Sequence, residues 1–487
     1  MDTPKNVLFI AVDDLRPEIN CFGKKKLHTP NLNKLASRSV QFNRAYCQVT
    51  ICMPSRASLL SGVRPDETWR ALIHQMCPNG EPSLPGYLKE NGYNTISIGK
   101  VYHHNDDDEA SWTRRYKDTF YEKEYTCDGY CSGYQLAENK KRIRNFSSRS
   151  QFGQEERRRN LPAICECADA SDSDYPDGMI ANRAIEILED LSSAPEPFFL
   201  ATGFYRPHLP WAVPQKYWDL YSRNDVDLAD NPFLPEDGIQ NSNLSDFLHY
   251  GDAEINSTYS DIGHYEGDGF PVLSEQKQRE CVHAYWASVS FVDAQIGKVL
   301  DELERLNLLD DTVIVLWGDN GWHLGEHGLW SKVTSFEEAT RVPLIVSAPG
   351  FTSDVQSDAM VELVDIYPTL CSLLGLQCPD HLEGLSFEPI LEEPAKPWKK
   401  AVFSRIFDAE TLRTGRYRFT RYAEATPEGD QRHRPNAGVC ELFDHLTDPR
   451  ENVNVARRPE RRELVKKLDD QLSAGWRAVL PDICLGL

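Results

Sequence analysis

The sequence predicts an α/β fold, with a large, mixed but mostly parallel sheet flanked by helices and a smaller α+β subdomain near the C-terminal end. Short β-rich apolar runs alternate with helical stretches through most of the chain, as parallel strands joined by helical crossovers require. The 487 residues suffice for one large domain and a small second one, and we expect these over residues 1–384 and 385–487. The β-rich runs are residues 7–12, 94–98, 198–202, 312–317 and 342–346.

The clearest helical stretch lies around residues 289–303, where apolar residues recur at intervals of three and four. This spacing places them on one face of a helix, so we predict a core helix without a catalytic role. Near the C-terminal end the pattern changes to short strands at 400–405 and 417–422 and then to an amphipathic helix over 460–479. That change predicts the α+β subdomain.

Two long segments lack a regular pattern, residues 111–177 and residues 224–268. The first carries charged runs at 140–144 and 155–159, which are typical of solvated faces. The second is rich in Asp, Asn and Gly. Both are long for connections in a compact domain, which favours functional insertions around the mouth of a site.

The composition excludes some classes of partner. The formal net charge is -22, and repulsion of that sign opposes binding to nucleic acid and to anionic lipid surfaces. An anionic substrate would need a local basic pocket. No apolar run approaches the ~18 residues of a membrane-spanning helix, so we expect no membrane span.

The first apolar run, residues 7–12, ends in Asp13 and Asp14 rather than in a small-residue cleavage site. It therefore predicts a buried strand and not a signal peptide. These residues alone leave the cellular location open.

The thirteen cysteines are an odd number, so at least one stays unpaired in any scheme built only of disulfides, and Cys52 is the natural candidate. The close pairs could be disulfides or reduced thiols, because a sequence does not give connectivity. The pairs at 127/131 and 165/167 lack the Cys-x-x-Cys spacing of a zinc ribbon, which disfavours a zinc site at either pair. The close pairs are Cys127 and Cys131, Cys165 and Cys167, and Cys371 and Cys378.

Two polar clusters directly follow predicted strands: Asp13 and Asp14 after the first, and Asp319 and Asn320 after the run at 312–317. Ligands of open α/β sheets gather outside the carboxyl ends of the strands, so these clusters can converge on one pocket. Their hard oxygen atoms suit calcium or magnesium better than zinc. Alone, Asp13 and Asp14 could simply cap a turn; together the clusters predict a shared metal.

Residues 52–62 read Cys-Met-Pro-Ser-Arg-Ala-Ser-Leu-Leu-Ser-Gly. A lone cysteine before such a run would more often be a buried residue at a helix start. The whole string, however, resembles the maturation signature of type I sulfatases, in which the cysteine is oxidised to Cα-formylglycine and its hydrate supplies the nucleophilic hydroxyl. A hydroxyl needs activation by a metal or a base, and a guanidinium such as that of Arg56 can steady the developing anion.

The resemblance to the sulfatases, and so to the alkaline phosphatase superfamily, extends from Asn6 to Ala456. It includes the first strand with its two aspartates, the Asp-Asn after the later strand, Gly-Lys-x-x-His at 99–103, an x-Pro-His segment at 206–208 and Gly-Glu-His-Gly-x-x-x-Lys at 325–332. The C-terminal stretch with Leu-Phe-Asp at 442–444 resembles the sulfatase C-terminal subdomain. Within the family, the motifs resemble the iduronate-2-sulfatase branch most.

The resemblance implies a role for each matched residue. It implies metal ligands at Asp13, Asp14, Cys52, Asp319 and Asn320. It implies catalytic roles for Cys52, Arg56, His103 and His208, with His208 as the general acid. It implies substrate contacts for Lys100, Lys332, His327 and Arg206.

We therefore expect residues 1–384 to be a catalytic domain that removes sulfate from a sulfated sugar of an anionic polysaccharide or its oligosaccharides. The cofactors implied are Ca²⁺, with Mg²⁺ as the alternative, and formylglycine, which a formylglycine-generating enzyme makes during maturation. The resemblance also implies export to a periplasmic, extracellular or lysosome-like compartment, although this sequence shows no signal peptide and a cytoplasmic location stays open.

Two other functions are compatible with the same motifs: a formylglycine-dependent phosphonate or phosphodiester hydrolase, and a non-catalytic glycan-binding relative. Neither the glycan nor the sulfated hydroxyl can be assigned from the sequence. Candidate sugar contacts, chosen only because they lie near catalytic segments in the sequence, are Trp69, Arg70, His74, Arg206, Trp211, Trp322 and His323.

Overall fold

The computed structural model describes most of the chain. The charged run at 155–159, the sugar-contact candidates Trp69, Arg70 and His74, and residues 239–268 lie outside the described part. The described residues are 6–65, 80–103, 107–116, 126–127, 130–131, 133–146, 162–238, 273–407, 409–422 and 439–481.

The centre of the molecule is an eight-stranded mixed sheet in which only β11 runs antiparallel to both of its neighbours. The predicted α/β class and mostly parallel sheet are confirmed, and the five predicted runs are β1, β3, β8, β10 and β11. The strands in spatial order are β12 (Val355–Glu362), β2 (Val40–Tyr46), β11 (Arg341–Ser347), β10 (Thr312–Gly318), β1 (Asn6–Val12), β8 (Phe198–Phe204), β3 (Asn94–Gly99) and β4 (Arg114–Tyr116).

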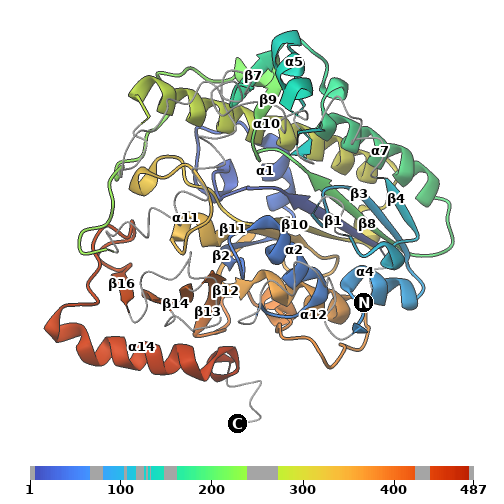
Figure 1. Ribbon diagram of the computed structural model, residues 1–487. Coiled ribbons are helices and arrows are strands. Elements are labelled where there is room, and N and C mark those ends of the chain that lie inside the picture. Colours follow the sequence, from blue (N-terminus) through green and yellow to red (C-terminus); the bar gives the residue numbers. More distant parts are fainter. Residues whose placement is uncertain are drawn as a thin grey trace.

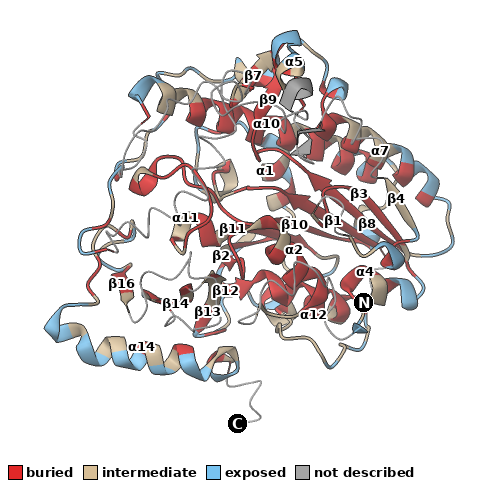
Figure 2. Ribbon diagram, in the orientation of Figure 1, coloured by how far each residue is buried: buried red, intermediate tan, exposed pale blue. Residues whose placement is uncertain are grey.

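Helices cover both faces of this sheet (Figure 1). Alternate residues of β1 point to opposite faces, so Leu8 and Ile10 join one core while Val7 and Phe9 join the other. The central strands are buried along their length, as Figure 2 shows. The first core is covered by α1 (Pro30–Ala36), α7 (Pro176–Leu191) and α10 (Glu275–Arg305), and the second by α2 (Cys52–Ser61), α4 (Leu84–Glu90), α12 (Ile366–Leu373) and α13 (Glu388–Glu392).

The predicted core helix is the C-terminal half of α10, which begins at Ser274, whose side chain caps the backbone N–H of Lys277. Val289 and Ile296 are fully buried against the sheet, as the spacing predicts. The charged run at 140–144 lies on α5. The other described strands and α-helices before the C-terminal part are β5 (Thr126–Cys127), β6 (Tyr130–Cys131), β7 (Cys165–Ala168), β9 (Trp211–Pro214), α5 (Ala137–Phe146), α8 (Gln215–Trp218) and α11 (Glu337–Thr340).

The C-terminal end forms a four-stranded antiparallel sheet covered by one helix, so the predicted α+β subdomain is confirmed. Leu412, Phe419 and Leu468 belong to its own core. The predicted domain boundary at residue 384 stays a prediction; Ile390 on α13 still packs in the core of the large sheet. The elements are β13 (Ala401–Ile406), β14 (Ala409–Thr414), β15 (Tyr417–Tyr422), β16 (Cys440–Asp444) and α14 (Arg462–Ala474).

Two further predictions concern membrane spans and cysteines. Within the described residues, no helix combines the length and the apolar character that a membrane crossing needs. Cys165 and Cys167 are not joined in a disulfide, and neither are Cys371 and Cys378. The side chains of the third close pair, at 127 and 131, lie outside the described part.

Asp172, at the start of a 3-10 turn (Asp172–Asp174), ties that turn to two helices. Its carboxylate accepts hydrogen bonds from Tyr217 Oη at 3.0 Å and from Lys298 Nζ at 2.9 Å, and it lies 2.8 Å from Lys216 Nζ. Burial alone would raise the pKa of Asp172, but the hydrogen bonds from the two lysines outweigh burial and hold it at about 2. The carboxylate is therefore ionised and stabilising in the folded protein at neutral pH.

We expect Asp172→Asn to lower the free energy of unfolding at neutral pH by about 1–3 kcal/mol, because buried charge-assisted hydrogen bonds are lost. Since the folded-state pKa lies below the unfolded value of ~3.9, this stabilisation is complete above about pH 4 and disappears as the pH falls towards 2. Urea midpoints of wild type and variant should therefore converge over that window. Asp470→Asn, which removes an exposed ion pair with Lys466, should leave the midpoint unchanged at every pH; a pH-independent difference for Asp172→Asn would contradict the explanation.

Candidate active site

The candidate site lies where four adjacent parallel strands of the main sheet end. β1 pairs with β10 on one side and with β8 on the other, and β8 pairs with β3. Asp13 follows β1, Asp319 follows β10 and Lys100 follows β3. The strand order therefore places side chains from distant parts of the sequence at one edge, as ligand sites of open α/β sheets require.

The end of β3 lies unusually close to β8. A Cβ atom at Gly203 would come within 2.0 Å of the backbone of Lys100, so only glycine fits there. This close approach leaves the Lys100 side chain free to reach across β8 to β1, where its ammonium donates to Asp13 Oδ2. The glycine on β8 thus decides where the Lys100 charge lies.

Three carboxylates and a thiol form the centre of the site. Asp13, Asp14 and Asp319 are fully buried, and their oxygen atoms lie within 4.8 Å of one another and of Cys52 Sγ. Asp14 adopts a left-handed backbone conformation with φ 56°, and its N–H donates to Asp319 Oδ1 at 2.9 Å. Strain of this kind at a non-glycine residue is typical of functional sites.

Cys52 is the first residue of α2 and is 3% exposed. Its Sγ lies 3.7 Å from Asp14 Oδ1 and accepts a hydrogen bond from Lys332 Nζ at 3.0 Å. Burial raises the pKa of the Cys52 thiol well above its ordinary value, and the charges of Asp13 and Asp319 raise it further. The side chain is thus an uncharged thiol at the positive end of a ten-residue helix, a position that favours anions.

Arg56 lies one turn along α2 from Cys52, because residues four apart share a helix face. Its guanidinium donates to Asp319 Oδ2 at 2.7 Å, to Asp13 Oδ1 at 3.2 Å and to the carbonyls of Lys100 and Val101. Arg56 is fully buried, so it joins the ends of β1, β3 and β10 from behind the carboxylates.

The charges within the site are strongly coupled. Burial would raise the pKa of Asp13, but Lys100, His208 and Arg56 hold it well below its ordinary value. Burial raises the pKa of Asp14 to about 7 in spite of Lys332, with Asp13 adding to the increase. The pKa values of these two adjacent aspartates therefore differ sharply. Lys100 and its neighbours outweigh the effect of burial on Asp13, whereas Lys332 does not outweigh it on Asp14.

The residues fit a divalent cation. Within the described part of the chain, Asp14 Oδ2 and Asn320 Oδ1 are buried without a hydrogen-bond partner. Asn320 Nδ2 donates to Asp14 Oδ1 at 2.8 Å, which leaves its oxygen as the free atom. Carboxylate and amide oxygens are the donors that calcium and magnesium prefer, and such a cation would satisfy both atoms.

His208 lies in the segment after β8, with its Nε2 3.8 Å from Asp14 Oδ2. Its Nδ1 is 2.6 Å from the carbonyl of Leu209. A carbonyl only accepts, so Nδ1 carries the proton and Nε2 is the nitrogen that faces the Asp14 carboxylate. Arg206 is buried and donates to the carbonyls of His208 and Ala212, so it holds this segment in place.

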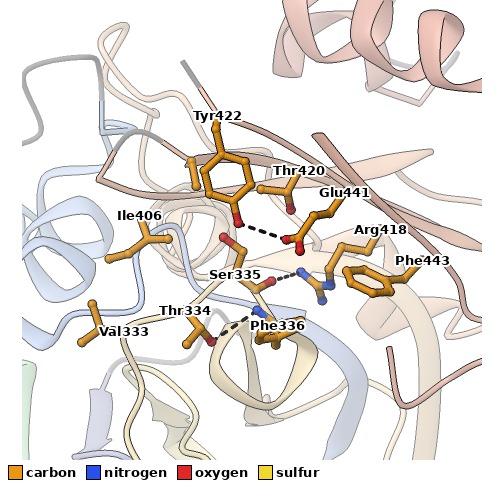
Figure 3. Close-up of a pocket in the computed structure, with 11 residues that line it drawn as sticks. Val333, Thr334, Ser335, Phe336, Ile406, Arg418, Thr420, Tyr422, Glu441 and Phe443 are labelled. Carbon is orange, nitrogen blue, oxygen red and sulfur yellow. Dashed lines mark hydrogen bonds between the residues drawn. The ribbon is translucent and has the colours of Figure 1, made fainter. Parts of the chain in front are cut away.

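Lys332 completes the cluster, with Nζ 2.6 Å from Asp14 Oδ1. The loop that follows it packs on the C-terminal subdomain around a small cavity of about 20 Å³, which has room for one water (Figure 3). Arg418 on β15 donates to the carbonyl of Ser335 at 2.7 Å, and Tyr422 donates to Glu441 at 3.0 Å across the same cavity. The subdomain therefore helps to hold the loop that carries Lys332.

Two further predicted residues are His103 and His327. His103 is half-buried, three residues beyond Lys100. His327 stacks on Phe336, with ring centroids 4.2 Å apart, and lies within reach of Glu338 and Glu451 instead of the aspartates. The catalytic role of His103 and the substrate contacts of His327 and Arg206 stay predictions.

The sugar-contact candidates in the described part are buried. Trp211 is fully buried and packs edge-on against Tyr285 and Trp322, and His323 is fully buried beside Thr334. Trp322 lies under the ammonium of Lys332, 5.6 Å from its ring centroid. These residues support the site from within the core, and proximity in sequence was a poor guide to exposure.

Two contributors to the site were not predicted. Tyr285 on α10 donates to the carbonyl of Asp14 at 2.8 Å and accepts from the N–H of Arg16, so it fixes the left-handed turn. Trp317 on β10 lies 5.6 Å from the guanidinium of Arg56. Trp317 belongs to the apolar run predicted as a strand and Tyr285 lies outside the predicted helix, and no local signal marks either side chain as part of the site.

The fold and the family models together define an enzyme of the hydrolase class, and the structure places Cys52 at a helix start beside a cluster of buried carboxylates. The sulfatase family model matches residues 5–376, and a second model, described as N-sulphoglucosamine sulphohydrolase, C-terminal, matches residues 325–477. The chain belongs to the sulfatase family of sulfuric ester hydrolases, and the resemblance predicted from the motifs is confirmed.

A relative in sequence agrees with this assignment, and solved structures share the fold. The chain is 34% identical to human iduronate 2-sulfatase over 427 residues, which cover 78% of this chain and 71% of that protein. Its fold is similar to that of a phosphonate monoester hydrolase from Silicibacter pomeroyi, with TM-score 0.73 and 20% identity over 98% of this chain and 96% of that one. A protein solved in complex with its substrate D-glucosamine-2-N,6-O-disulfate gives TM-score 0.70 and 20% identity, with 98% of both chains covered.

We expect Arg56→Met to lower the free energy of unfolding by about 3–5 kcal/mol in metal-free protein, because two buried carboxylates lose their partner. Arg56→Lys should recover little of this loss, since a single ammonium cannot contact both aspartates and two carbonyls. Differential scanning calorimetry in the presence of a chelator measures both effects. Arg183→Met, which removes a partly exposed ion pair with Glu186, is the matched control and should shift the melting temperature only slightly. Equal shifts for Arg56→Met and Arg183→Met would contradict the assigned role of Arg56.

Proposed function

We propose that this sulfatase removes sulfate from a sulfated sugar of an anionic polysaccharide or its oligosaccharides. The proposed nucleophile is a formylglycine hydrate derived from Cys52, and the proposed metal is Ca²⁺. One observation carries the proposal: Cys52, within the maturation motif, begins α2 and contacts both Lys332 and Asp14 inside the carboxylate cluster.

Maturation requires a separate enzyme, and we propose a formylglycine-generating enzyme as the partner. The thiol of Cys52 is buried and uncharged, so it is not a ready nucleophile as it stands. Its aldehyde hydrate would supply the hydroxyl that attacks sulfur. The modified residue would keep the helix-start position, where the backbone N–H groups favour a negatively charged oxygen.

Lys332 and Lys100 are the proposed sulfate-binding residues. Three buried carboxylates and the three cations Arg56, Lys100 and Lys332 cancel in formal charge. A bound divalent cation would leave two positive charges in excess. The single negative charges of a sulfate monoester and of an ionised nucleophile would balance them. The site therefore attracts an anionic ester in spite of the chain's net charge of -22.

His208 is the proposed general acid. Since Nδ1 donates to the Leu209 carbonyl, only Nε2 can give a proton to the departing sugar oxygen. Burial and Lys332 hold the pKa of His208 well below its ordinary value in the free protein. A sulfate anion beside the ring would raise that pKa again, so substrate binding would itself favour the protonated acid. Arg206 positions this ring through its contacts with the carbonyls of His208 and Ala212.

The proposed ligands of the cation are Asp13, Asp14, Asp319, Asn320 and the oxygen that replaces the sulfur of Cys52. The cation would supply positive charge beside the nucleophile and the sulfate. The all-oxygen donor set favours Ca²⁺, with Mg²⁺ as the alternative. Arg56, behind the carboxylates, keeps them in position for this role.

The sugar substrate is supported by the relationship to human iduronate 2-sulfatase, whose name specifies a sulfated uronic acid. The likeness to the phosphonate monoester hydrolase shows the common fold alone, so phosphonate esters serve as the comparison substrate in the test below. Export from the cytoplasm stays part of the proposal.

We expect protein made together with a formylglycine-generating enzyme to carry the aldehyde at position 52 and to release sulfate from sulfated oligosaccharides. Peptide mass spectrometry and sulfate detection by ion chromatography measure the two properties on one sample. Cys52→Ala should lower sulfate release by at least about 10⁴-fold, since the nucleophile is gone. Cys165→Ser, at a thiol on β7 outside the site, is the control and should keep full activity. Activity retained in Cys52→Ala would exclude the covalent mechanism, and faster turnover of phosphonate than of sulfate esters would favour the other hydrolase.

We expect calcium to raise the melting temperature of the protein and Asn320→Leu to reduce that increase, because the variant lacks one oxygen ligand. Binding should displace a proton from Asp14, whose pKa is raised to about 7. The apparent affinity should therefore rise about tenfold per pH unit below that value and level off above it. Isothermal titration calorimetry across this range, with magnesium in parallel, checks the direction; an affinity independent of pH would mean that Asp14 is not a ligand.

A further inference from the structure

A second group of metal-binding side chains lies outside the active site, where the large domain meets the C-terminal subdomain. One nitrogen of His327 and one carboxylate oxygen each of Glu338 and Glu451 lie within 4.8 Å of one another. Zinc binds nitrogen and oxygen ligands at ~2.0–2.2 Å, so atoms grouped this closely need only small side-chain movements to bind a single ion. The active-site mechanism uses none of the three residues.

His327 provides an independent indication of a ligand. Its side chain is 1% exposed, and within the described part of the chain both ring nitrogens lack a hydrogen-bond partner. A buried imidazole without a partner is costly, and the structure fixes this ring firmly by stacking it on Phe336. The backbone of Phe233 lies beside the ring, and a backbone carbonyl is the kind of group to which a metal-bound histidine donates its other N–H.

Glu338 and Glu451 each have a carboxylate oxygen that can still accept a further bond near the His327 ring. Glu338 Oε2 is buried without a hydrogen-bond partner among the described residues. Glu451 is fully buried, and its Oε2 accepts only the N–H of Glu337 in the hydrogen bonds described, at 2.9 Å, which leaves a lone pair. Both oxygens are thus available to a cation.

The backbone is strained at two of these three residues. His327 has φ 56° and Glu451 has φ 57°, both in the left-handed region that disfavours residues with a side chain. Asp14 in the active site shows the same feature. The cost of about 1–2 kcal/mol at each residue is typical of positions where a side chain must point at a fixed target.

A neighbouring set of potential metal ligands, which also includes Glu451, is a weaker candidate for a metal site. Glu337 and His445 also lie near Glu451, but cationic side chains already occupy that side. Arg418 donates to both glutamates, and Arg413 donates to Glu337 at 3.1 Å. A metal ion there would have to compete with two guanidinium groups, whereas no such cation lies between His327 and Glu338 in the contacts described.

We propose that His327, Glu338 and Glu451 bind a divalent transition-metal ion of the zinc class. Imidazole with two carboxylates is a ligand set that zinc accepts, and it differs from the all-oxygen set of the active site. The ion would join η7 (Glu326–Gly328) and α11, which flank the loop carrying Lys332, to the C-terminal subdomain. This gives His327 a structural role in place of the substrate contact predicted from the sequence, and it does not depend on the proposed catalytic function.

The test uses full-length protein carrying Asp13→Asn and Asp14→Asn, so that the active site does not contribute bound metal. After loading with zinc and dialysis against zinc-free buffer, plasma mass spectrometry should find one zinc per chain. Added His327→Gln or Glu338→Gln should each lower zinc affinity by at least about tenfold. The matched control His445→Gln should leave the zinc content unchanged, because that residue belongs to the neighbouring group.

A second measurement keeps the proposal falsifiable if a variant folds poorly. Crystals of the zinc-loaded protein should show an anomalous difference peak at the zinc edge between His327, Glu338 and Glu451. A protein that retains no zinc, a zinc content unaffected by His327→Gln, equal loss in His445→Gln, or an ordinary water in place of the anomalous peak would each overturn the proposal.

Discussion

The burial of three carboxylates at one edge of the sheet is the constraint on which the rest of the structure depends. Asp13, Asp14 and Asp319 are fully removed from water, where each ionised group would be strongly destabilised without a partner. Arg56, Lys100 and Lys332 supply the compensating charge, and each comes from a different element. Compensation is uneven, because burial still raises the pKa of Asp14 and of Asp319. The three positive side chains balance the formal charge, but Asp14 and Asp319 remain the less well compensated carboxylates.

The main sheet meets this constraint through its strand order. Because β10, β1, β8 and β3 are neighbours, their carboxyl ends present two acidic turns, a lysine and the histidine segment side by side. The start of α2 lies against the same edge, and Ser55 donates to the carbonyl of Asp319 at 2.5 Å, which joins the helix to the end of β10. The position of Cys52 therefore follows from backbone packing and does not rely on a flexible loop.

The sequence predicted those parts that carry local signals. The apolar runs of β1, β3, β8, β10 and β11 and the acidic turns after β1 and β10 could be recognised because each is compact in sequence. β2 was missed, since Gln41, Asn43 and Arg44 interrupt its apolar pattern, and β14 was missed for a similar reason, with Glu410 and Arg413 in a six-residue strand.

The unpredicted parts of the site depend on tertiary packing. The helix predicted around residues 289–303 stops short of Tyr285, and the sequence could not show that its hydroxyl meets the turn at Asp14, because that contact spans 271 residues. His327 lies within a recognised motif, yet the left-handed backbone directs its ring to Phe336. A motif identifies which residues belong to a family pattern, whereas the direction of each side chain follows from backbone conformation and packing.

The C-terminal subdomain contributes to the active site through the position of one ammonium group. Lys332 lies in a loop without helix or strand, and such a loop would not by itself fix a charge. On one side, Thr50 donates to the carbonyl of Thr334 at 2.9 Å; on the other, Arg418 holds the carbonyl of Ser335. Arg418 is in turn fixed by Glu337 and Glu451 in a buried network that weakens if any member is removed. A small antiparallel sheet thus helps to hold the ammonium group of Lys332 beside Asp14 and Cys52, so the two parts of the chain jointly build the site.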